Sequence, residues 1–135
     1  IPELKKFAKG PATNGSFLNQ LMNRSKICVN NSAGTSLHMR ALEILGSGSF
    51  MISRYIPSDL DNADLREYFV EGDEIVFFTD EEDFRKKVAY YLVDDHVEER
   101  EQIAKRAHKK ALSLLGYKAV AKKLIETVYE GFNHE

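Results

Sequence analysis

The spacing of apolar side chains along the chain alternates between two periods. Apolar residues recur every three or four positions at 17–22 and at 37–45, which is typical of amphipathic helices. Short and nearly continuous apolar runs lie beside them: KICVN at 26–30, SFMIS at 49–53 and EIVFF at 74–78. These runs have the length of strands. The pattern therefore predicts helices that alternate with strands.

Capping residues and glycines predict where the first helices begin and end. We expect Asn14 to cap the first helix, and Thr35 or Ser36 to begin the second. Gly46 or Gly48 should end the second helix, since glycine readily adopts the left-handed conformation there. After the second strand we expect a loop and a short helix that ends near residue 69.

The second half of the chain is predicted to be mainly helical. Residues 79–82, TDEE, have the sequence of a capping box, in which the Thr79 hydroxyl and the Glu82 carboxylate bind each other's backbone amides. The helix that follows has Phe84, Val88 and Tyr91 on one face. Two more helices close the chain, one ending at Gly116 and one at Gly131.

This order of elements predicts an α/β protein. We expect a Rossmann-like partial parallel sheet of three or four strands, flanked by helices, with two C-terminal helices. The three strands lack strict alternation of apolar and polar residues, which indicates that helices cover both faces of the sheet. We expect the 135 residues to form a single domain. Because the sequence opens at Ile1, we expect it to be a fragment of a longer protein.

Composition excludes several classes of protein. The net charge of −2 argues against a nucleic-acid or anionic-membrane partner, and no apolar run is long enough to span a bilayer. The single cysteine, Cys28, rules out an internal disulfide and fits a buried thiol in a reducing, cytoplasmic location. The four histidines have no cysteine partners at ligand spacing, so we expect no metal site.

Two clusters of small residues flank the second predicted helix. SAGTS, at 32–36, follows a strand and precedes the helix, whereas GSGS, at 46–49, follows the helix. Ligands in parallel sheets bind beyond the carboxyl ends of strands, where the amino ends of helices attract anions. Topology therefore favours SAGTS as an anion site and GSGS as a structural turn, although every parallel strand has such a junction.

At this point a family resemblance appears. The segment SKICVNNSAGTSLHMRALEILGSGSFMIS resembles the C-terminal half of GT-B glycosyltransferases, in the group similar to spore maturation proteins. The shared features are a strand that ends in Asn30 or Asn31, the small-residue loop, Arg40 and Glu43 on a helix, and a glycine before the next strand. EGDEIVFFTDEEDFRKKVAYYL and the later helices match the same group in the same order, so the resemblance covers residues 14 to about 130.

The resemblance implies a domain that binds a nucleotide-sugar donor. Glu43 would accept hydrogen bonds from the ribose hydroxyls, and Gly10–Ala12 would lie near the base. Amides at the start of the helix, at Gly34–Leu37, would bind the diphosphate. A helix amino terminus stabilises the charge that accumulates on a departing nucleotide. The donor-site residues implied in this way are Gly34, Thr35, Ser36, Leu37, Arg40 and Glu43.

The sequence departs from the family pattern in two ways. Thr35 stands where many retaining members have a glutamate near the sugar. The superfamily also has an arginine and a lysine that clamp the diphosphate, and an N-terminal domain that binds the acceptor, and we expect both to lie outside this sequence. The resemblance therefore implies a glycosyltransferase that is inactive as this isolated domain. The alternative is a non-catalytic Rossmann-like binding or assembly module.

Several residues have plainer interpretations beside the functional ones. Glu43 could be an exposed helix residue, Arg40 could bind phosphate or hold Glu43 in a salt bridge, and His38 is better explained as a surface histidine. The acidic loop that contains Asp59, Asp61 and Asp64 resembles the magnesium site of receiver-type domains, but it lacks the adjacent acidic pair that those domains use. We expect no metal or cofactor, and we expect the nucleotide-sugar to be a substrate. The sheet edge could mediate dimerisation.

Overall fold

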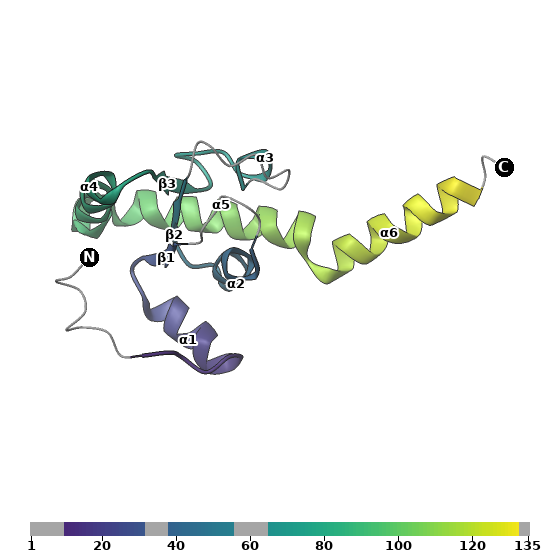
Figure 1. Ribbon diagram of the computed structural model, residues 1–135, viewed down its shortest axis with the longest axis horizontal. Helices are drawn as coiled ribbons and strands as arrows, with labels where there is room; N and C mark the ends of the chain where they lie inside the picture. The colour runs from purple at the N-terminus through teal and green to yellow at the C-terminus, as the bar shows by residue number, and fades with distance from the viewer. Residues whose placement is uncertain (1–9, 32–37, 56–64, 133–135) are drawn as a thin grey trace.

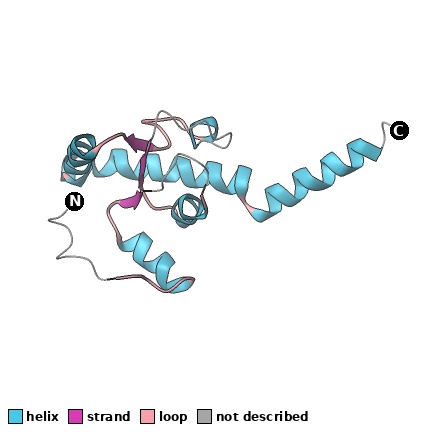
Figure 2. Ribbon diagram, viewed as in Figure 1, coloured by secondary structure: helices cyan, strands magenta, loops and turns pink. Residues whose placement is uncertain are grey.

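The computed structural model describes residues 10–31, 38–55 and 65–132 of the chain. Its elements alternate as the apolar pattern predicts, and two long helices follow the sheet (Figure 1, Figure 2). In chain order they are α1 (Ser16–Arg24), β1 (Cys28–Asn30), α2 (Met39–Ser47), β2 (Met51–Arg54), α3 (Leu65–Tyr68), β3 (Val76–Phe78), α4 (Glu81–Leu92), the 3₁₀ turn η2 (Asp94–His96), α5 (Val97–Leu115) and α6 (Tyr117–Phe132).

The three strands form one parallel sheet in the order β1-β2-β3. Val29 of β1 pairs with Ile52 of β2, and Ile52 pairs with Val76 of β3. Each connection between neighbouring strands contains a helix, α2 or α3, as a parallel pair requires. The α/β class, the parallel sheet and the two C-terminal helices are therefore confirmed.

Each face of the sheet packs against a separate hydrophobic cluster. On one face, Met51 and Phe77 pack with residues of α1, α2, α3 and α5. On the other face, Ile52 and Val76 pack with Tyr91 of α4 and the first half of α5. The long helix α5 contributes to both clusters, and Figure 1 shows it running past the whole sheet. It therefore joins the two halves of the core.

The prediction that helices cover both faces of every strand was wrong for β1. Val29 is 43% exposed, although Cys28 and Asn30 on either side of it are buried. The aromatic side chains of α4, such as Phe84, pack over Phe78 of β3, which leaves this side of the outer strand β1 open. An apolar residue in an edge strand is therefore not evidence of burial.

The end of α2 lies at a predicted glycine, whereas α1 and α2 begin later than predicted. Gly48 ends α2 in the left-handed conformation, with φ of 79°, and its amide donates to carbonyls of the last turn. The predicted start at Thr35 or Ser36 was wrong, because His38 is extended and α2 begins at Met39. The first helix begins after Gly15, one residue later than a cap at Asn14 implies.

The N-cap of α4 lies one residue later than the predicted one. Asp80, not Thr79, is the N-cap, and its Oδ1 accepts a hydrogen bond from the Asp83 amide at 2.9 Å. The Asp83 carboxylate in turn accepts from the Thr79 amide at 3.1 Å. A carboxylate accepts more strongly than a hydroxyl at the positive end of a helix, which explains why Asp80 takes the position.

A bend at Gly116 separates α5 from α6. A side chain at this position would place its Cβ 2.6 Å from the Leu112 carbonyl oxygen, so only glycine fits without a shift of the backbone. Beyond the bend, α6 runs away from the body of the molecule (Figure 1). Gly116 thus ends a helix as predicted, whereas Gly131 does not, since α6 continues to Phe132.

Burial raises the pKa of two ionisable side chains in the core, Cys28 and Tyr91. Cys28 is buried as predicted, which raises the pKa of its thiol and makes it unreactive. Burial also raises the pKa of Tyr91 to about 12, with a further contribution from the nearby Glu99 carboxylate.

Loss of the Tyr91 hydroxyl proton should make the protein less stable at high pH. The folded pKa of about 12 lies above the ordinary value of 10.0, so the folded state holds this proton more tightly than the unfolded state does. The resulting stability is complete below pH 10 and is lost between pH 10 and 12, up to about 2 kcal/mol. Urea denaturation at pH 9, 10 and 11 should therefore show a steeper fall for the natural chain than for Tyr91→Phe. Equal slopes would contradict the assignment.

Candidate functional site

The carboxyl ends of the three strands define one edge of the sheet, to which the sequence assigns the ligand. Asn30, Arg54 and Phe78 end β1, β2 and β3, and α4 begins directly beyond β3. Most of the predicted diphosphate site lies outside the described residues: Gly34, Thr35, Ser36 and Leu37. The acidic loop with Asp59, Asp61 and Asp64 also lies outside them.

The predicted site residues that the structure describes are on α2. His38 is the exposed N-cap of this helix, and its carbonyl accepts from the Ala41 amide at 2.9 Å. Arg40 and Glu43 lie in the first two turns, where the partial positive charge of the helix is greatest. The later start of α2 therefore brings Glu43 closer to the amino end of the helix than the sequence indicates.

Arg40 and Glu43 form an ion pair on the surface of α2. The Arg40 Nε lies 3.4 Å from Glu43 Oε2, and the two side chains are 60% and 39% exposed. This geometry matches the salt-bridge interpretation of Arg40. Solvent competes strongly for so open a pair, so it costs little to rearrange. The Glu43 carboxylate therefore remains accessible to a ligand.

An apolar hollow of about 350 Å³ adjoins Glu43. Met39 and Leu42 line it from α2, and Leu112 and Leu115 line it from α5. Tyr117, at the start of α6, also lines the hollow and is 92% exposed. The carboxylate of Glu43 therefore stands at the rim of a surface that suits the carbon face of a ligand.

A second hollow of about 450 Å³ contains a residue that the sequence analysis missed. Arg54 lines it together with Val29 and Asn31 at the end of β1, and with Thr79 and Asp80 at the start of α4. The apolar run SFMIS ends at Ser53, so the pattern assigns no role to Arg54. Its signal is its place as the first basic residue after that apolar run, at the ligand edge.

A buried polar pair lies just below this edge. The Asn30 side-chain amide donates to Ser53 Oγ at 3.0 Å, and both residues are almost completely buried. Buried polar groups of this kind require partners, so the pair fixes the ends of β1 and β2 relative to each other. The asparagine that ends β1 in the family pattern thus has a structural role here.

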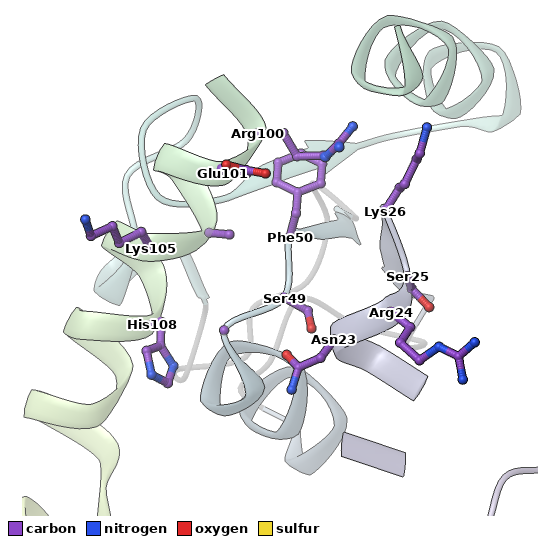
Figure 3. A pocket seen from close by; sticks show the side chains of 12 residues that line it. Asn23, Arg24, Ser25, Lys26, Ser49, Phe50, Arg100, Glu101, Lys105 and His108 are labelled. Carbon is purple, nitrogen blue, oxygen red and sulfur yellow. The ribbon is translucent and has the colours of Figure 1, made fainter. Parts of the chain in front are cut away.

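The opposite edge of the sheet carries a third hollow, of about 450 Å³, beside the GSGS turn (Figure 3). Figure 3 shows Arg24 and Lys105 pointing away from its centre. The buried Arg100 donates to the Tyr91 carbonyl, and His108 Nδ1 lies 2.9 Å from the Leu45 carbonyl oxygen. Arg100 therefore contacts the carboxyl end of α4, and His108 contacts that of α2. The structural interpretation of GSGS agrees with this arrangement.

Other predicted features are explained by packing. Phe69 and Tyr91 are buried, and the exposed Tyr90 hydroxyl donates to Glu99 at 2.9 Å. Gly10–Ala12 form a connection before α1, with Gly10 at φ of 83°. Among the described residues there is no group of three metal-ligating side chains. Over the same residues, no helix is both long and apolar enough to cross a bilayer.

Residues 3–126 match the model of a family described as glycosyl transferase-like, which covers both the sheet and the first helices after it. No curated protein and no solved structure matches the chain. The family match includes α2 with Arg40 and Glu43, the three strands and the carboxyl edge described above. The chain therefore belongs to the glycosyl transferase-like family.

Proposed function

We propose that this chain is the nucleotide-sugar donor domain of a GT-B glycosyltransferase, in the group similar to spore maturation proteins. The observation that carries the proposal is the position of Glu43. It is an accessible carboxylate in the second turn of the helix that follows β1, inside the segment matched to the glycosyl transferase-like family. The sugar would pass from a nucleoside diphosphate to an acceptor bound by a separate domain.

The chemistry of Glu43 suits a ribose. An ionised carboxylate accepts several hydrogen bonds and can take both hydroxyls of one ribose. The apolar hollow next to it gives the carbon face of the nucleoside a surface to lie against. In this arrangement Arg40 turns from Glu43 toward the diphosphate, and residues Gly34–Leu37 supply amides. No metal or other cofactor is needed, because the helix terminus and Arg40 balance the diphosphate charge.

A second candidate is a non-catalytic Rossmann-like module, located like the enzyme in the cytoplasm. The ion pair between Arg40 and Glu43 favours it, since each charge already has a partner without a ligand. Thr35, in place of a glutamate, points the same way. The two candidates differ in one measurable property, which is affinity for nucleotides.

Replacement of Glu43 by glutamine tests the proposal. We expect UDP, GDP or ADP, or a sugar conjugate of one of them, to shift amide signals of residues 38–43 in a two-dimensional NMR titration. Glu43→Gln should weaken that binding by roughly 10- to 100-fold, because a charge-assisted acceptor becomes a neutral amide. Addition of EDTA should leave the affinity unchanged.

The matched control is Glu82→Gln. Glu82 is likewise an exposed helical glutamate in an ion pair, with Lys86 at 2.7 Å, but it lies on α4. We expect this variant to bind the nucleotide as the natural chain does. Equal losses in both variants would show a general charge effect and contradict a ribose contact at Glu43. An absence of signal shifts at millimolar nucleotide would favour the non-catalytic module.

A further inference from the structure

The third hollow, at the edge of the sheet opposite to the proposed donor site, is lined by an excess of basic side chains (Figure 3). Its volume of about 450 Å³ is that of a site for a small molecule. Four positive charges and one negative charge line it, on Arg24, Lys26, Arg100, Lys105 and Glu101. The net charge of the whole chain is −2, so this excess of positive charge is a local feature. Such a hollow attracts anions.

Arg100 is the only charged residue that is buried in the part of the chain that the structure describes. It is 7% exposed, and its guanidinium donates to the Tyr91 carbonyl at the carboxyl end of α4. Within the same residues, Arg100 forms no ion pair with a carboxylate. A helix terminus supplies only about half a negative charge, and a guanidinium has five N–H donors. The described protein groups therefore compensate only part of this buried charge, and buried charges are stable when they are fully paired.

The side chain of Arg100 crosses the hollow toward a second cation. Figure 3 shows it extending from α5 toward the side on which Lys26 lies. Lys26 Nζ is 4.0 Å from Asp94 Oδ1, and these two side chains are 59% and 93% exposed. Solvent weakens so open an ion pair, so an anion of higher charge in the hollow can take Lys26 from Asp94 at little cost.

Further donors come from α5 and α1. Lys105 and Arg24 are exposed and point outward in Figure 3, and neither forms an ion pair within the described residues. Because no carboxylate holds them, these long side chains can turn toward an anion in the hollow. Asn23, in the last turn of α1, lines the same hollow and adds an amide that can donate hydrogen bonds.

We propose that this hollow binds the phosphate or diphosphate group of a small soluble molecule. Arg100 contacts the phosphate oxygens with N–H groups that the Tyr91 carbonyl does not use, since a guanidinium matches the geometry of phosphate. Lys26 and Lys105 flank the group from two different elements. The excess of positive charge suits a group with two or more negative charges better than a single carboxylate. This ligand is distinct from the donor that we propose for the carboxyl edge of the sheet.

An NMR titration with inorganic pyrophosphate tests the site. We expect shifts of the amide signals at residues 23–26, 48–50 and 100–108, with a dissociation constant below about 1 mM. Lys105→Glu should weaken this binding roughly 10-fold, because an attraction becomes a repulsion. The matched control is Lys123→Glu, which makes the same change in net charge at an exposed lysine of α6 that lines none of the three hollows. It should change the affinity by no more than about 2-fold.

Substitution of Arg100 tests the centre of the site. Arg100→Gln should weaken pyrophosphate binding by roughly 10- to 100-fold, because a charged donor becomes a neutral one. This variant also loses its contact with α4, so circular dichroism must show that it folds. Lys26→Glu, at an exposed position, should lower the affinity as Lys105→Glu does and decides the question if Arg100→Gln does not fold. Glu43→Gln should leave pyrophosphate binding at this hollow unchanged, which separates it from the proposed donor site.

Three results would overturn the proposal. These are an absence of shifts at about 10 mM pyrophosphate, shifts confined to residues 38–43, and equal losses in Lys105→Glu and Lys123→Glu. Lipid headgroups carry the same phosphate chemistry on a flat surface. Vesicles that contain phosphatidic acid should not cosediment the chain, because the phosphate has to enter a concave hollow. Cosedimentation that Lys105→Glu abolishes would assign the site to a membrane instead of a soluble molecule.

Discussion

Phe69→Ala should lower the free energy of unfolding by about 3–5 kcal/mol, the largest effect that we expect from a single substitution. Phe69 is only 2% exposed and packs in the same cluster as Leu65 and Ile75. Removal of its ring loses the transfer free energy of the side chain and leaves a cavity that rigid neighbours cannot fill. The midpoint of urea denaturation measures this loss directly.

The adjacent residue provides a control for Phe69. Val70 is 57% exposed, and Val70→Ala should change the free energy of unfolding by no more than about 0.5 kcal/mol. Since domains of this size are stable by only about 5–15 kcal/mol, Phe69→Ala removes a large part of the total. Similar denaturation midpoints for the two variants would mean that Phe69 is not part of the core.

Asn30→Asp should cost about 3 kcal/mol at pH 7, because it places a carboxylate in a nearly inaccessible position. The Asn30 side chain donates to Ser53 Oγ, and an ionised aspartate has no proton to donate. Burial should raise the folded pKa of the new carboxyl above its value in the unfolded chain. The folded state then binds the proton more tightly, so stability falls as the pH rises through that interval.

The pH dependence distinguishes this mechanism from a loss of packing. Denaturation at pH 4 and at pH 7 should show a smaller deficit for Asn30→Asp at the lower pH, where the carboxyl is protonated. Asn30→Ala, which introduces no charge, should show the same deficit at both. A deficit of Asn30→Asp that does not change with pH would contradict the burial of this site.

Prediction from the sequence succeeded best where the local backbone conformation strongly favours one type of residue. Gly48 ends α2 because the left-handed conformation found there favours glycine. The short apolar runs between helical segments form the parallel strands, as their length indicates. Prediction failed where several residues could serve equally well. Thr79 and Asp80 both have capping oxygens, and the choice between them depends on how β3 enters α4.

The candidate site was less predictable than the fold. The place of Glu43 on a helix beyond β1 followed from the pattern and the resemblance, but its neighbours across the hollow, Leu112 and Tyr117, come from α5 and α6. No local pattern joins residues so far apart in the chain. Val29 shows the same limit, since its exposure depends on how far α4 extends over the sheet. Local sequence therefore specifies elements better than it specifies surfaces shared between them.

The close approach at Gly116 makes the direction of α6 sensitive to one methyl group. A Cβ at this position cannot stay 2.6 Å from the Leu112 carbonyl oxygen, so the two helix axes would have to rotate relative to each other. Because α6 is about 24 Å long, a rotation of ~20° would move its far end by about 8 Å. The direction of α6, and with it the position of the far end of this helix, therefore depends on the absence of a side chain at Gly116.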